Sequence, residues 1–358
     1  MKNNYDVVVI GAGPAGALFA AQLARGAENF SILIVDGCSE SNPKVCGGLL
    51  SPDAQKVLSK LNLTLPNKIL SDPQIFDVAT LDLCSKIRRN YQRHYLNMDR
   101  YAFDKWLISN IPTTVDIFNG RCTSLRADNG MITVDLCDDS GALTVSTRYI
   151  VGADGANSIV RRSFFNTKVR KYVAIQQHFK CDDELLPPYS CIFDPVTSKS
   201  CSWTILKDGY AIFGGAFDKK DCRRAFELQK RRFEEFVGVD FGEPIKTEAC
   251  LVTSPERLKD FVVGQNNVFL VGEAAGFISA SSFEGISNAM ISAKCLADAF
   301  IKGKEPEKIL KLYKKNTLGL KLKLGGKIFK RNILCSPMFR FLIMKSGIKS
   351  VKKFNENV

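Results

Sequence analysis

The sequence has only two histidines, His94 and His178, and its 12 cysteines include no Cys-x-x-Cys pair. The two histidines lie far apart, and neither has the spacing of a metal ligand. These shortages argue against zinc ribbons and iron–sulfur clusters, so we expect no bound metal. Scattered single cysteines are typical of reduced thiols in the cytosol, and we expect a cytoplasmic protein.

Long apolar stretches are also missing. No run approaches the ~18 apolar residues that a membrane-spanning helix needs, and the N-terminus lacks the basic flank and cleavage site of a signal peptide. The apolar fraction of 45% and the charged fraction of 24% are ordinary for a globular protein and exclude a disordered or fibrous chain. The 358 residues correspond to two or three domains.

Acidic residues are scarce at the C-terminal end. Residues 1–300 contain 34 Lys and Arg against 34 Asp and Glu, whereas residues 301–358 contain 16 against 3 and carry the whole net charge of +13. Basic and apolar residues alternate there, which disfavours nucleic acid as a partner. Gly325-Gly326 and Pro337 are expected to divide the segment into two or three short helices. Two interpretations stay open, namely a surface on anionic lipid or a helical cap with solvated lysines.

A strand, a glycine-rich loop, a helix and a second strand open the sequence. Residues 5–10 and 31–35 are β-branched apolar runs typical of buried parallel strands. Between them, the loop 11–16 has the pattern Gly-x-Gly-x-x-Gly, and the second strand ends at Asp36. This arrangement predicts a dinucleotide site, with a ribose hydroxyl on Asp36 and the pyrophosphate at the helix N-terminus. The expected contacts in the loop are Gly11, Gly13, Pro14, Ala15 and Gly16.

Two later segments favour FAD over NAD. Residues 148–155 form a strand that ends in Asp154-Gly155, and residues 267–273 form another that ends in Gly272-Glu273. A carboxylate at such a turn can accept hydrogen bonds from the ribityl hydroxyls of a flavin. The helix that follows can stabilise the negative charge that develops on reduction.

The three motifs, in this order, resemble the FAD-binding fold shared by aromatic hydroxylases, flavin halogenases and geranylgeranyl reductases, over roughly residues 1–300. The resemblance implies an α/β fold (PHBH-like), in which a Rossmann-like FAD-binding domain carries an inserted antiparallel-sheet substrate domain and a C-terminal helical segment. The expected limits are 1–65, 97–172 and 253–300 for the FAD-binding domain, 66–96 and 173–252 for the substrate domain, and 301–358 for the basic segment. Glu273 stands where the family usually has Asp. There is no second glycine-rich motif, so we expect no separate NAD(P)H domain.

Three shorter segments narrow the resemblance. Residues 44–50 contain Cys-Gly-Gly, residues 99–104 contain Arg-x-x-Phe-Asp, and residues 276–286 end in Glu-Gly-Ile. They resemble the geranylgeranyl reductase family of FAD-dependent oxidoreductases, and are closest to its bacterial CbrA-type subgroup. Phe283 and Ala280 depart from its pattern, where the family has glycine and often proline. The resemblance adds expected cofactor contacts at Gly47, Gly48, Arg100, Cys122, Gly285 and Ile286.

Two residues are the main candidates for contact with the substrate. Cys46 is either a proton donor or substrate wall at the flavin, or a small residue in a tight loop. Trp203 either lines the pocket or belongs to the core of the substrate domain, and Gln176, Gln177 and His178 are weaker candidates. Arg100 either contacts FAD or pairs with Asp104. Strands are predicted at 189–193, 202–206 and 210–214, followed by a helix at 221–236.

The resemblance implies a flavin reductase that saturates C=C bonds of an apolar, isoprenoid-like substrate by hydride transfer from FAD N5. The alternative is an FAD-dependent monooxygenase that hydroxylates a small substrate through a flavin C4a-hydroperoxide. A third hypothesis is a membrane-associated FAD-binding protein without turnover. Electrons would come from NAD(P)H or a ferredoxin-like protein, and the basic segment could place the protein on the inner face of the membrane.

Overall fold

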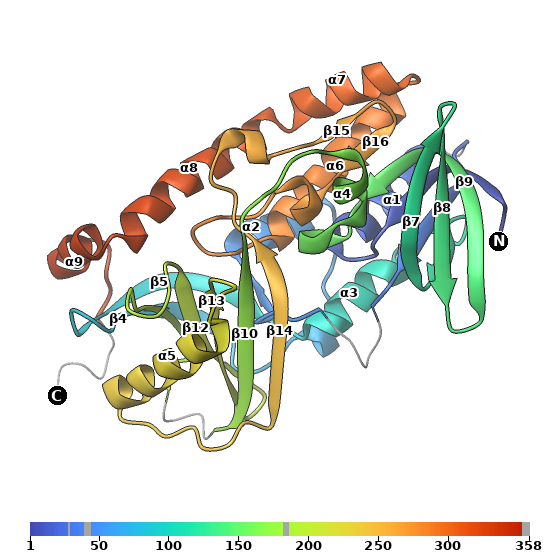
Figure 1. Cartoon of the computed structure of the whole chain (residues 1–358). Helices are drawn as coiled ribbons and strands as arrows, with labels where there is room; N and C mark the ends of the chain where they lie inside the picture. The colour runs from blue at the N-terminus through green and yellow to red at the C-terminus, as the bar shows by residue number, and fades with distance from the viewer. Residues whose placement is uncertain (28, 39–43, 182–185, 353–358) are drawn as a thin grey trace. The chain divides into compact units, whose positions relative to one another are not determined.

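The computed structural model describes residues 1–27, 29–38, 44–181 and 186–352. The chain forms two compact units, and each is assembled from separated segments (Figure 1). Unit 1 comprises Met1–Lys44, Tyr101–Arg170 and Thr253–Gly326, and unit 2 comprises Val45–Arg100, Lys171–Val252 and Lys327–Val358. The mixed α/β architecture confirms the predicted fold class.

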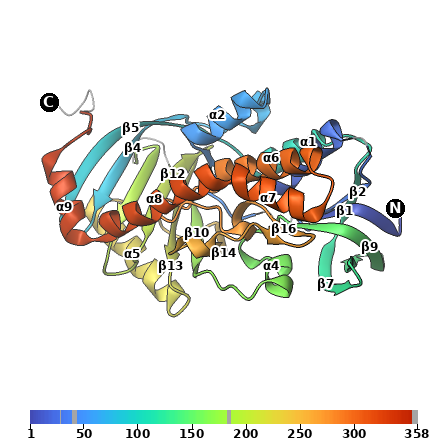
Figure 2. The ribbon, with the colours of Figure 1, turned by 90° about the horizontal axis from the view of Figure 1, so that it is seen from above.

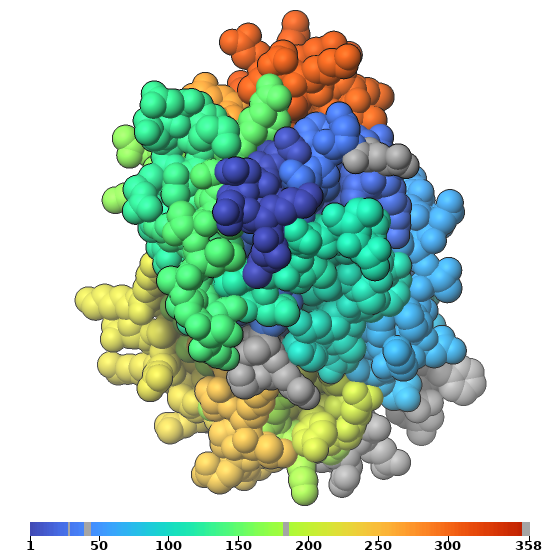
Figure 3. All heavy atoms as spheres, turned by 90° about the vertical axis from the view of Figure 1, so that its right-hand side faces the viewer, coloured from blue at the N-terminus to red at the C-terminus, as the bar shows by residue number. Residues whose placement is uncertain are grey.

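Unit 1 is built on a sheet in the order β15-β16-β9-β1-β2-β6, in which β16, β9, β1, β2 and β6 run parallel. The apolar runs of the sequence become strands because β-branched side chains pack on both faces of a buried parallel sheet. The antiparallel meander β7–β8–β9 extends this sheet. Figure 3 shows the N-terminal residues (dark blue) beside the green residues of the meander. The strands are β1 (Asn4–Ile10), β2 (Ile32–Asp36), β6 (Asp116–Asn119), β7 (Arg121–Asp128), β8 (Met131–Asp138), β9 (Gly141–Gly152), β15 (Gly264–Gln265) and β16 (Val268–Leu270).

Helices α1 and α6 pack together in unit 1, and α7 packs on α6. Phe300 of α6 meets Phe19 of α1 edge to face with 5.6 Å between ring centroids, and it meets Tyr149 of β9 at 5.1 Å. These aromatic pairs fasten the helices to the sheet. The helices of this unit are α1 (Pro14–Gly26), α3 (Arg100–Ser109, whose first residue falls in unit 2), α4 (Ile159–Phe164), α6 (Ile286–Lys302) and α7 (Pro306–Asn316).

Unit 2 is built on a second sheet in the order β14-β10-β13-β12-β11-β4-β5-β3. The pairs from β10 to β11 are antiparallel, as is β4 with β5, whereas β11 and β4 run parallel. The strands and helix predicted between residues 189 and 236 are formed as β11, β12, β13 and α5. The elements are β3 (Leu49–Leu50), β4 (Ile75–Asp82), β5 (Ile87–Asn97), β10 (Lys171–Lys180), β11 (Tyr189–Phe193), β12 (Cys201–Lys207), β13 (Tyr210–Phe217), β14 (Lys246–Thr253), α2 (Pro52–Lys60) and α5 (Cys222–Val237).

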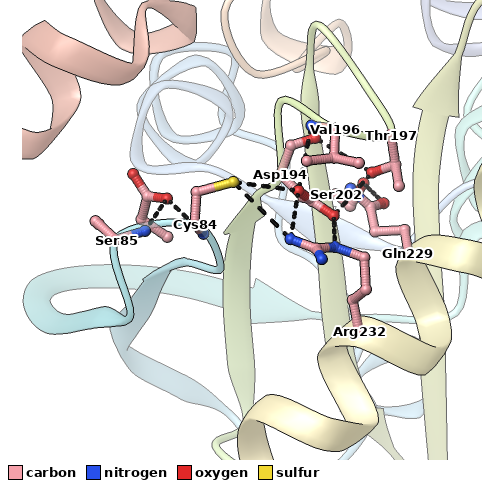
Figure 4. A network of polar contacts seen from close by, with 9 residues as sticks. Cys84, Ser85, Asp194, Val196, Thr197, Ser202, Gln229 and Arg232 are labelled. Carbon is pink, nitrogen blue, oxygen red and sulfur yellow. Dashed lines mark hydrogen bonds and ion pairs between the residues drawn. The ribbon is translucent and has the colours of Figure 1, made fainter.

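Helix α5 covers one face of this sheet. Its Phe226 and Phe233 pack on Phe213 of β13, each with 5.5 Å between ring centroids. A polar network adds to this apolar core: Arg232 of α5 donates to Asp194, just after β11, at 2.7 Å (Figure 4). Since neighbouring residues of a strand alternate faces, Trp203 and His178 lie on the opposite face of the sheet from Phe213 and α5.

The C-terminal segment forms α7, α8 (Leu318–Cys335) and α9 (Pro337–Ser346). The predicted break at Gly325-Gly326 is wrong, because α8 runs through both glycines. A Cβ at Gly325 would lie 2.8 Å from Cδ2 of Leu258, so this glycine permits a close approach instead. Pro337 does start a new helix, as predicted. Among the described residues, no helix is both long and apolar enough to span a bilayer.

The limits of the two units differ from the expected domain limits at several points. Residues 45–65 and 97–100 lie in unit 2, and residues 301–326 lie in unit 1. The basic segment is therefore divided between the units within α8, and its last six residues lie outside the described part. Pairing of β3 with β5 accounts for the first difference, since it ties Leu49 and Leu50 to the second sheet.

Candidate functional site

The glycine loop lies at the carboxyl edge of the parallel sheet in unit 1, where β1 ends. Gly11 has φ +103°, and a Cβ there would lie 2.7 Å from the carbonyl oxygen of Ala153, after β9. A Cβ on Gly16 would overlap the carbonyl oxygen of Gly11. Both positions therefore require glycine, as the dinucleotide-binding pattern predicts.

Gly13 differs from its neighbours, because a Cβ there would have no atom of the protein within 4 Å. It is the N-cap residue of α1, with Pro14 at the first helical position and Ala15 buried behind it. The first turn has no acidic side chain. The space beside Gly13 at the start of α1 is therefore open and lies at the positive end of the helix dipole, as an anion site at a helix N-terminus requires.

Asp36 ends β2 and is buried. Its Oδ1 accepts from the Cys38 amide at 3.0 Å, and its Oδ2 accepts from Lys105 Nζ at 2.9 Å. Burial acts to lower the pKa of Lys105, but Asp36 outweighs it and the net pKa is raised. The sequence analysis missed Lys105, which comes from α3 and holds the Asp36 carboxylate in place.

Asp154 follows β9. Its Oδ2 accepts from the Ile159 amide at 2.6 Å, while its buried Oδ1 has no hydrogen-bond partner among the described residues. Burial raises the pKa of this carboxyl. Burial and the Asp154 charge also raise the pKa of Cys122 to about 12, which keeps Cys122 a thiol at neutral pH. A buried oxygen without a partner among the described residues is available to a cofactor hydroxyl.

Gly272 and Glu273 complete this edge. A Cβ on Gly272 would lie 3.0 Å from Cβ of Ala15, so the turn lies against the start of α1. Glu273 Oε1 accepts from the Thr253 amide at 2.8 Å, and its Oε2 lies 3.8 Å from Lys44 Nζ. A Cβ on Gly155 would lie 3.7 Å from the same Oε2. The three motifs therefore meet in one place.

Arg161 of α4 supports this turn and was not singled out by sequence. It is buried, and it donates to the carbonyl oxygens of Ala274 and Asp260, each at 2.9 Å. Burial lowers its pKa. Its contacts are with backbone carbonyls about 100 residues away in the chain, which no local pattern reveals.

The loop before α6 explains one departure from the family pattern. Gly285 is the N-cap of α6 and Ile286 is its first residue. Phe283, which replaces a family glycine, has φ +52°. This left-handed conformation suits glycine and is strained for a large side chain. The backbone therefore keeps a glycine-like course although the side chain has changed.

These features of unit 1 fit FAD. The open Gly13 backbone at the start of α1 would hold the pyrophosphate, Asp36 the ribose, and Asp154 or Glu273 the hydroxyls farther along the cofactor. The fit rests on the glycine cradle, on the open space beside Gly13 at the start of α1, and on Asp154 Oδ1, which has no partner among the described residues. Within the described residues, no group of three His, Cys, Asp or Glu side chains could hold a metal ion.

The Cys-Gly-Gly loop belongs to unit 2 and is fastened by Lys207 of β12. Lys207 Nζ donates to the carbonyl oxygens of Met98 at 2.6 Å and Gly47 at 3.1 Å. Gly48 has φ +69°, and a Cβ there would overlap the carbonyl oxygen of Met98, so glycine is required there. Burial lowers the pKa of Lys207, partly opposed by the Cys46 sulfur. Lys207 is a positioning residue for the loop that the sequence analysis did not identify.

Trp203 lies on the sheet face opposite α5. A Cβ on Gly214 of β13 would lie 2.5 Å from the indole Nε1, so the ring rests on this glycine. Gly47 lies beside Ile205 of β12, with 2.5 Å between a Cβ on the glycine and Cδ1 of Ile205. The half-buried tryptophan has no hydrogen-bond partner for Nε1 among the described residues.

A polar cluster occupies the β10–β14 side of the same face. His178 Nε2 lies 3.1 Å from Glu248 Oε2, which also accepts from Gln176 Nε2 at 2.9 Å. Burial lowers the pKa of His178 despite Glu248. Burial acts to raise the pKa of Glu248, but hydrogen bonds from Lys246, Gln176 and His178 outweigh it and the net pKa is lowered. Neutral imidazole therefore faces a carboxylate.

Two other predicted residues lie elsewhere. Gln177 points to the α5 side, where its Nε2 donates to Glu227 at 3.1 Å. Since neighbouring residues of a strand alternate faces, Gln177 does not join Gln176 and His178. Arg100 is the first residue of α3, as its helix-start motif predicts.

Comparison with known proteins identifies the class. The FAD binding domain family matches residues 4–320. The chain belongs to this family and is an FAD-dependent oxidoreductase. Protein CbrA of Shigella dysenteriae serotype 1 is 44% identical over 356 residues, which cover 99% of each chain. Protein CbrA of Escherichia coli K12 is 43% identical over 356 residues, with the same coverage. The resemblance to the CbrA-type subgroup is therefore supported.

Solved structures share the fold. A geranylgeranyl bacteriochlorophyll reductase-like protein from Thermoplasma acidophilum aligns with a TM-score of 0.80 and 18% identity, over 95% of this chain and 90% of that one. PqsL from Pseudomonas aeruginosa, a probable FAD-dependent monooxygenase, aligns with a TM-score of 0.71 and 16% identity, over 97% and 100%. Identities this low establish the architecture and leave the reaction open.

Proposed function

We propose that this oxidoreductase saturates C=C bonds of an isoprenoid-like lipid. The observation that carries the proposal is the gradient of polarity across the unit 2 sheet, on the face opposite α5. One register line runs from His178 through Ile212 and Ile205 to Tyr189. A second runs from Gln176 through Gly214 and Trp203 to Cys191. Both start at the polar cluster and continue over apolar side chains.

Such a face matches an amphipathic ligand. The apolar part continues into a small cluster of buried Ile75, Val78 and Tyr95, with Leu49, Tyr189 and Cys191 packed against it. An isoprenoid chain would lie along this part, and its polar head would reach His178 and Gln176. The unpartnered Gln176 Oε1 is an acceptor for a head-group hydroxyl.

The chain's own residues would set up the reaction. When bound and reduced, FAD supplies a hydride to one carbon of the double bond, and a proton completes the other carbon. Lys207 holds the Cys46 loop in place, and Gly47 of that loop lies against Ile205, which would keep water from this part of the face. Cys46 is our candidate proton donor, and a role as substrate wall remains its alternative. Trp203 would bound the substrate on its ring face.

We also propose that NAD(P)H or a ferredoxin-like protein supplies the electrons, because the sequence has one glycine-rich nucleotide motif. An isoprenoid lipid resides in a membrane, so the enzyme would work at the cytoplasmic face of one.

The test is anaerobic reoxidation of the reduced holoenzyme. Polyprenyl alcohols and polyprenyl phosphates are added, the visible flavin band is followed, and products are analysed for the gain of two hydrogens per double bond. We expect reoxidation by at least one polyprenyl lipid. Trp203→Ala should slow it about tenfold or more through the lost contact with substrate, whereas Trp106→Ala, on α3, is the matched control. No reoxidation by any polyprenyl lipid would reject the proposal.

The second candidate is hydroxylation of a small substrate. The polar cluster of His178, Glu248 and Gln176 favours it, because these groups suit a compact polar ligand. Oxygen uptake that depends on an aromatic substrate, with a hydroxylated product, would support it over the reductase.

A further inference from the structure

Helix α9 buries a charged residue and exposes apolar residues, which is the reverse of the usual arrangement. Arg340 is 2% exposed, whereas Phe339 and Leu342 are 49% and 55% exposed. The other outward residues are Met338, Phe341 and Ile343. A helix on the surface of a globular unit normally buries its apolar face and exposes its charges. Folding of unit 2 therefore does not account for the apolar outer face of α9.

Several contacts within unit 2 fix this orientation. Arg340 Nε donates to Asp82 Oδ2, at the end of β4, at 2.7 Å. Arg89 of β5 donates to the Met344 carbonyl oxygen at 2.9 Å, and the Val351 amide donates to the Asn90 carbonyl oxygen at 2.8 Å. Both ribbon views show α9 beside β5 (Figures 1 and 2). Rotation of α9 to bury Phe339 would break the pair with Asp82.

The sequence around α9 carries charge of one sign. Residues 308–355 contain no Asp or Glu. Lys330, Lys345, Lys349 and Lys352 are exposed, and exposed apolar Phe329 and Ile348 lie before and after the helix in the chain. Aromatic and aliphatic side chains among lysines are the composition of a helix that lies in the interface of an anionic bilayer.

We propose that the outer face of α9 inserts into the surface of an anionic lipid bilayer, with these lysines at the lipid headgroups. A second copy of the chain fits less well, because a two-fold contact would bring two faces of the same positive charge together. The proposal concerns where the protein binds, goes beyond the reaction proposed above, and holds for a reductase or a monooxygenase alike.

The test is co-sedimentation of the FAD-loaded full chain with vesicles. Phosphatidylglycerol mixed with phosphatidylcholine is compared with phosphatidylcholine alone. The wild type should bind the anionic vesicles, and added salt should weaken binding because it screens the lysines. The double variant Phe339→Ser/Leu342→Ser should lower the partition coefficient by about tenfold or more through lost apolar burial.

Phe76→Ser is the matched control, since Phe76 of β4 is 67% exposed and also belongs to unit 2. It should bind like the wild type, and equal flavin content should show that all variants fold. Lys345→Glu/Lys349→Glu gives a second variant that leaves the apolar side chains in place and should also weaken binding. The proposal is overturned if the wild type stays in solution with anionic vesicles, or if Phe339→Ser/Leu342→Ser binds them as well as the wild type. It is also overturned if these substitutions only dissociate a dimer. None of these readouts needs turnover, so they are separate from the test of the reaction.

Discussion

Replacement of Arg340 by methionine should destabilise unit 2 strongly. The Asp82 carboxylate is 1% exposed, and its Oδ2 accepts from Arg340 Nε, while its Oδ1 accepts from the Cys84 and Ser85 amides. Without Arg340, a buried negative charge loses its only cationic partner in the described structure. Stranding one member of a buried pair costs about 3–5 kcal/mol. The loss of the Arg340 bond to the Leu334 carbonyl oxygen acts in the same direction.

Urea unfolding followed by tryptophan fluorescence measures the loss in the free energy of unfolding of unit 2. The chain has two tryptophans, and Trp106 lies in unit 1 while Trp203 lies in unit 2. In a Trp106→Phe background, the fluorescence therefore reports on unit 2. Adding Asp82→Asn to Arg340→Met should recover about 2 kcal/mol, because it removes the stranded charge.

Lys345→Met is the control, since Lys345 is an exposed charge on the same helix. It should change the free energy of unfolding by less than about 0.5 kcal/mol. The reasoning fails if Arg340→Met costs less than about 1 kcal/mol. It also fails if the double variant is no more stable than Arg340→Met alone.

Three further predictions concern the two candidate sites. Gly13→Val should leave folding intact, because no protein atom lies within 4 Å of the new Cβ. It should weaken FAD retention by about tenfold or more, because the side chain would fill the expected pyrophosphate position. Unchanged flavin content after dialysis would contradict this. Lys207→Met should lower the free energy of unfolding of unit 2 by about 2 kcal/mol, because the loop loses its hydrogen bonds to the Lys207 ammonium. It should also speed alkylation of Cys46, measured by mass spectrometry. An unchanged rate of Cys46 alkylation would argue against the positioning role. The stability of unit 2 should fall as pH drops below ~6.5. The folded pKa of His178 is depressed, so the unfolded chain binds the proton first. Glu248, also depressed, adds a loss of the same sign at more acidic pH. His178→Asn should flatten the first part of the urea-midpoint profile, and an unaltered profile would contradict the assignment.

The strands, the glycine loop and the two later turns of unit 1 could be predicted because most of their signals are local. Strand, glycine loop, helix and acid follow one another within residues 5–36, and the carboxyl ends of parallel strands necessarily share an edge. That geometry brings Asp154 and Gly272 to the loop although they are far away in sequence.

The contacts within unit 2 were less accessible from sequence. Lys207 acts on carbonyl oxygens more than 100 residues away, and Arg340 pairs with Asp82 across 258 positions. Backbone carbonyls have no residue signature, so no pattern marks such partners. Helix α8 shows the converse, because it continues through Gly325 and Gly326 despite their low helix propensity, and Gly325 lies close to Leu258, which is distant in sequence.

The pairing of α9 with β4 has a consequence for synthesis of the chain. Unit 2 begins at Val45, yet the arginine that neutralises Asp82 follows it by 258 positions in the chain. Until then the nascent unit holds an uncompensated carboxylate and an uncovered β5. Ribosome-bound chains that stop before Pro337 should therefore stay sensitive to protease and hold on to chaperones. Unit 2 is therefore completed only after its sheet strands have been made, and truncations that remove Arg340 should lower the yield of folded protein before they affect chemistry.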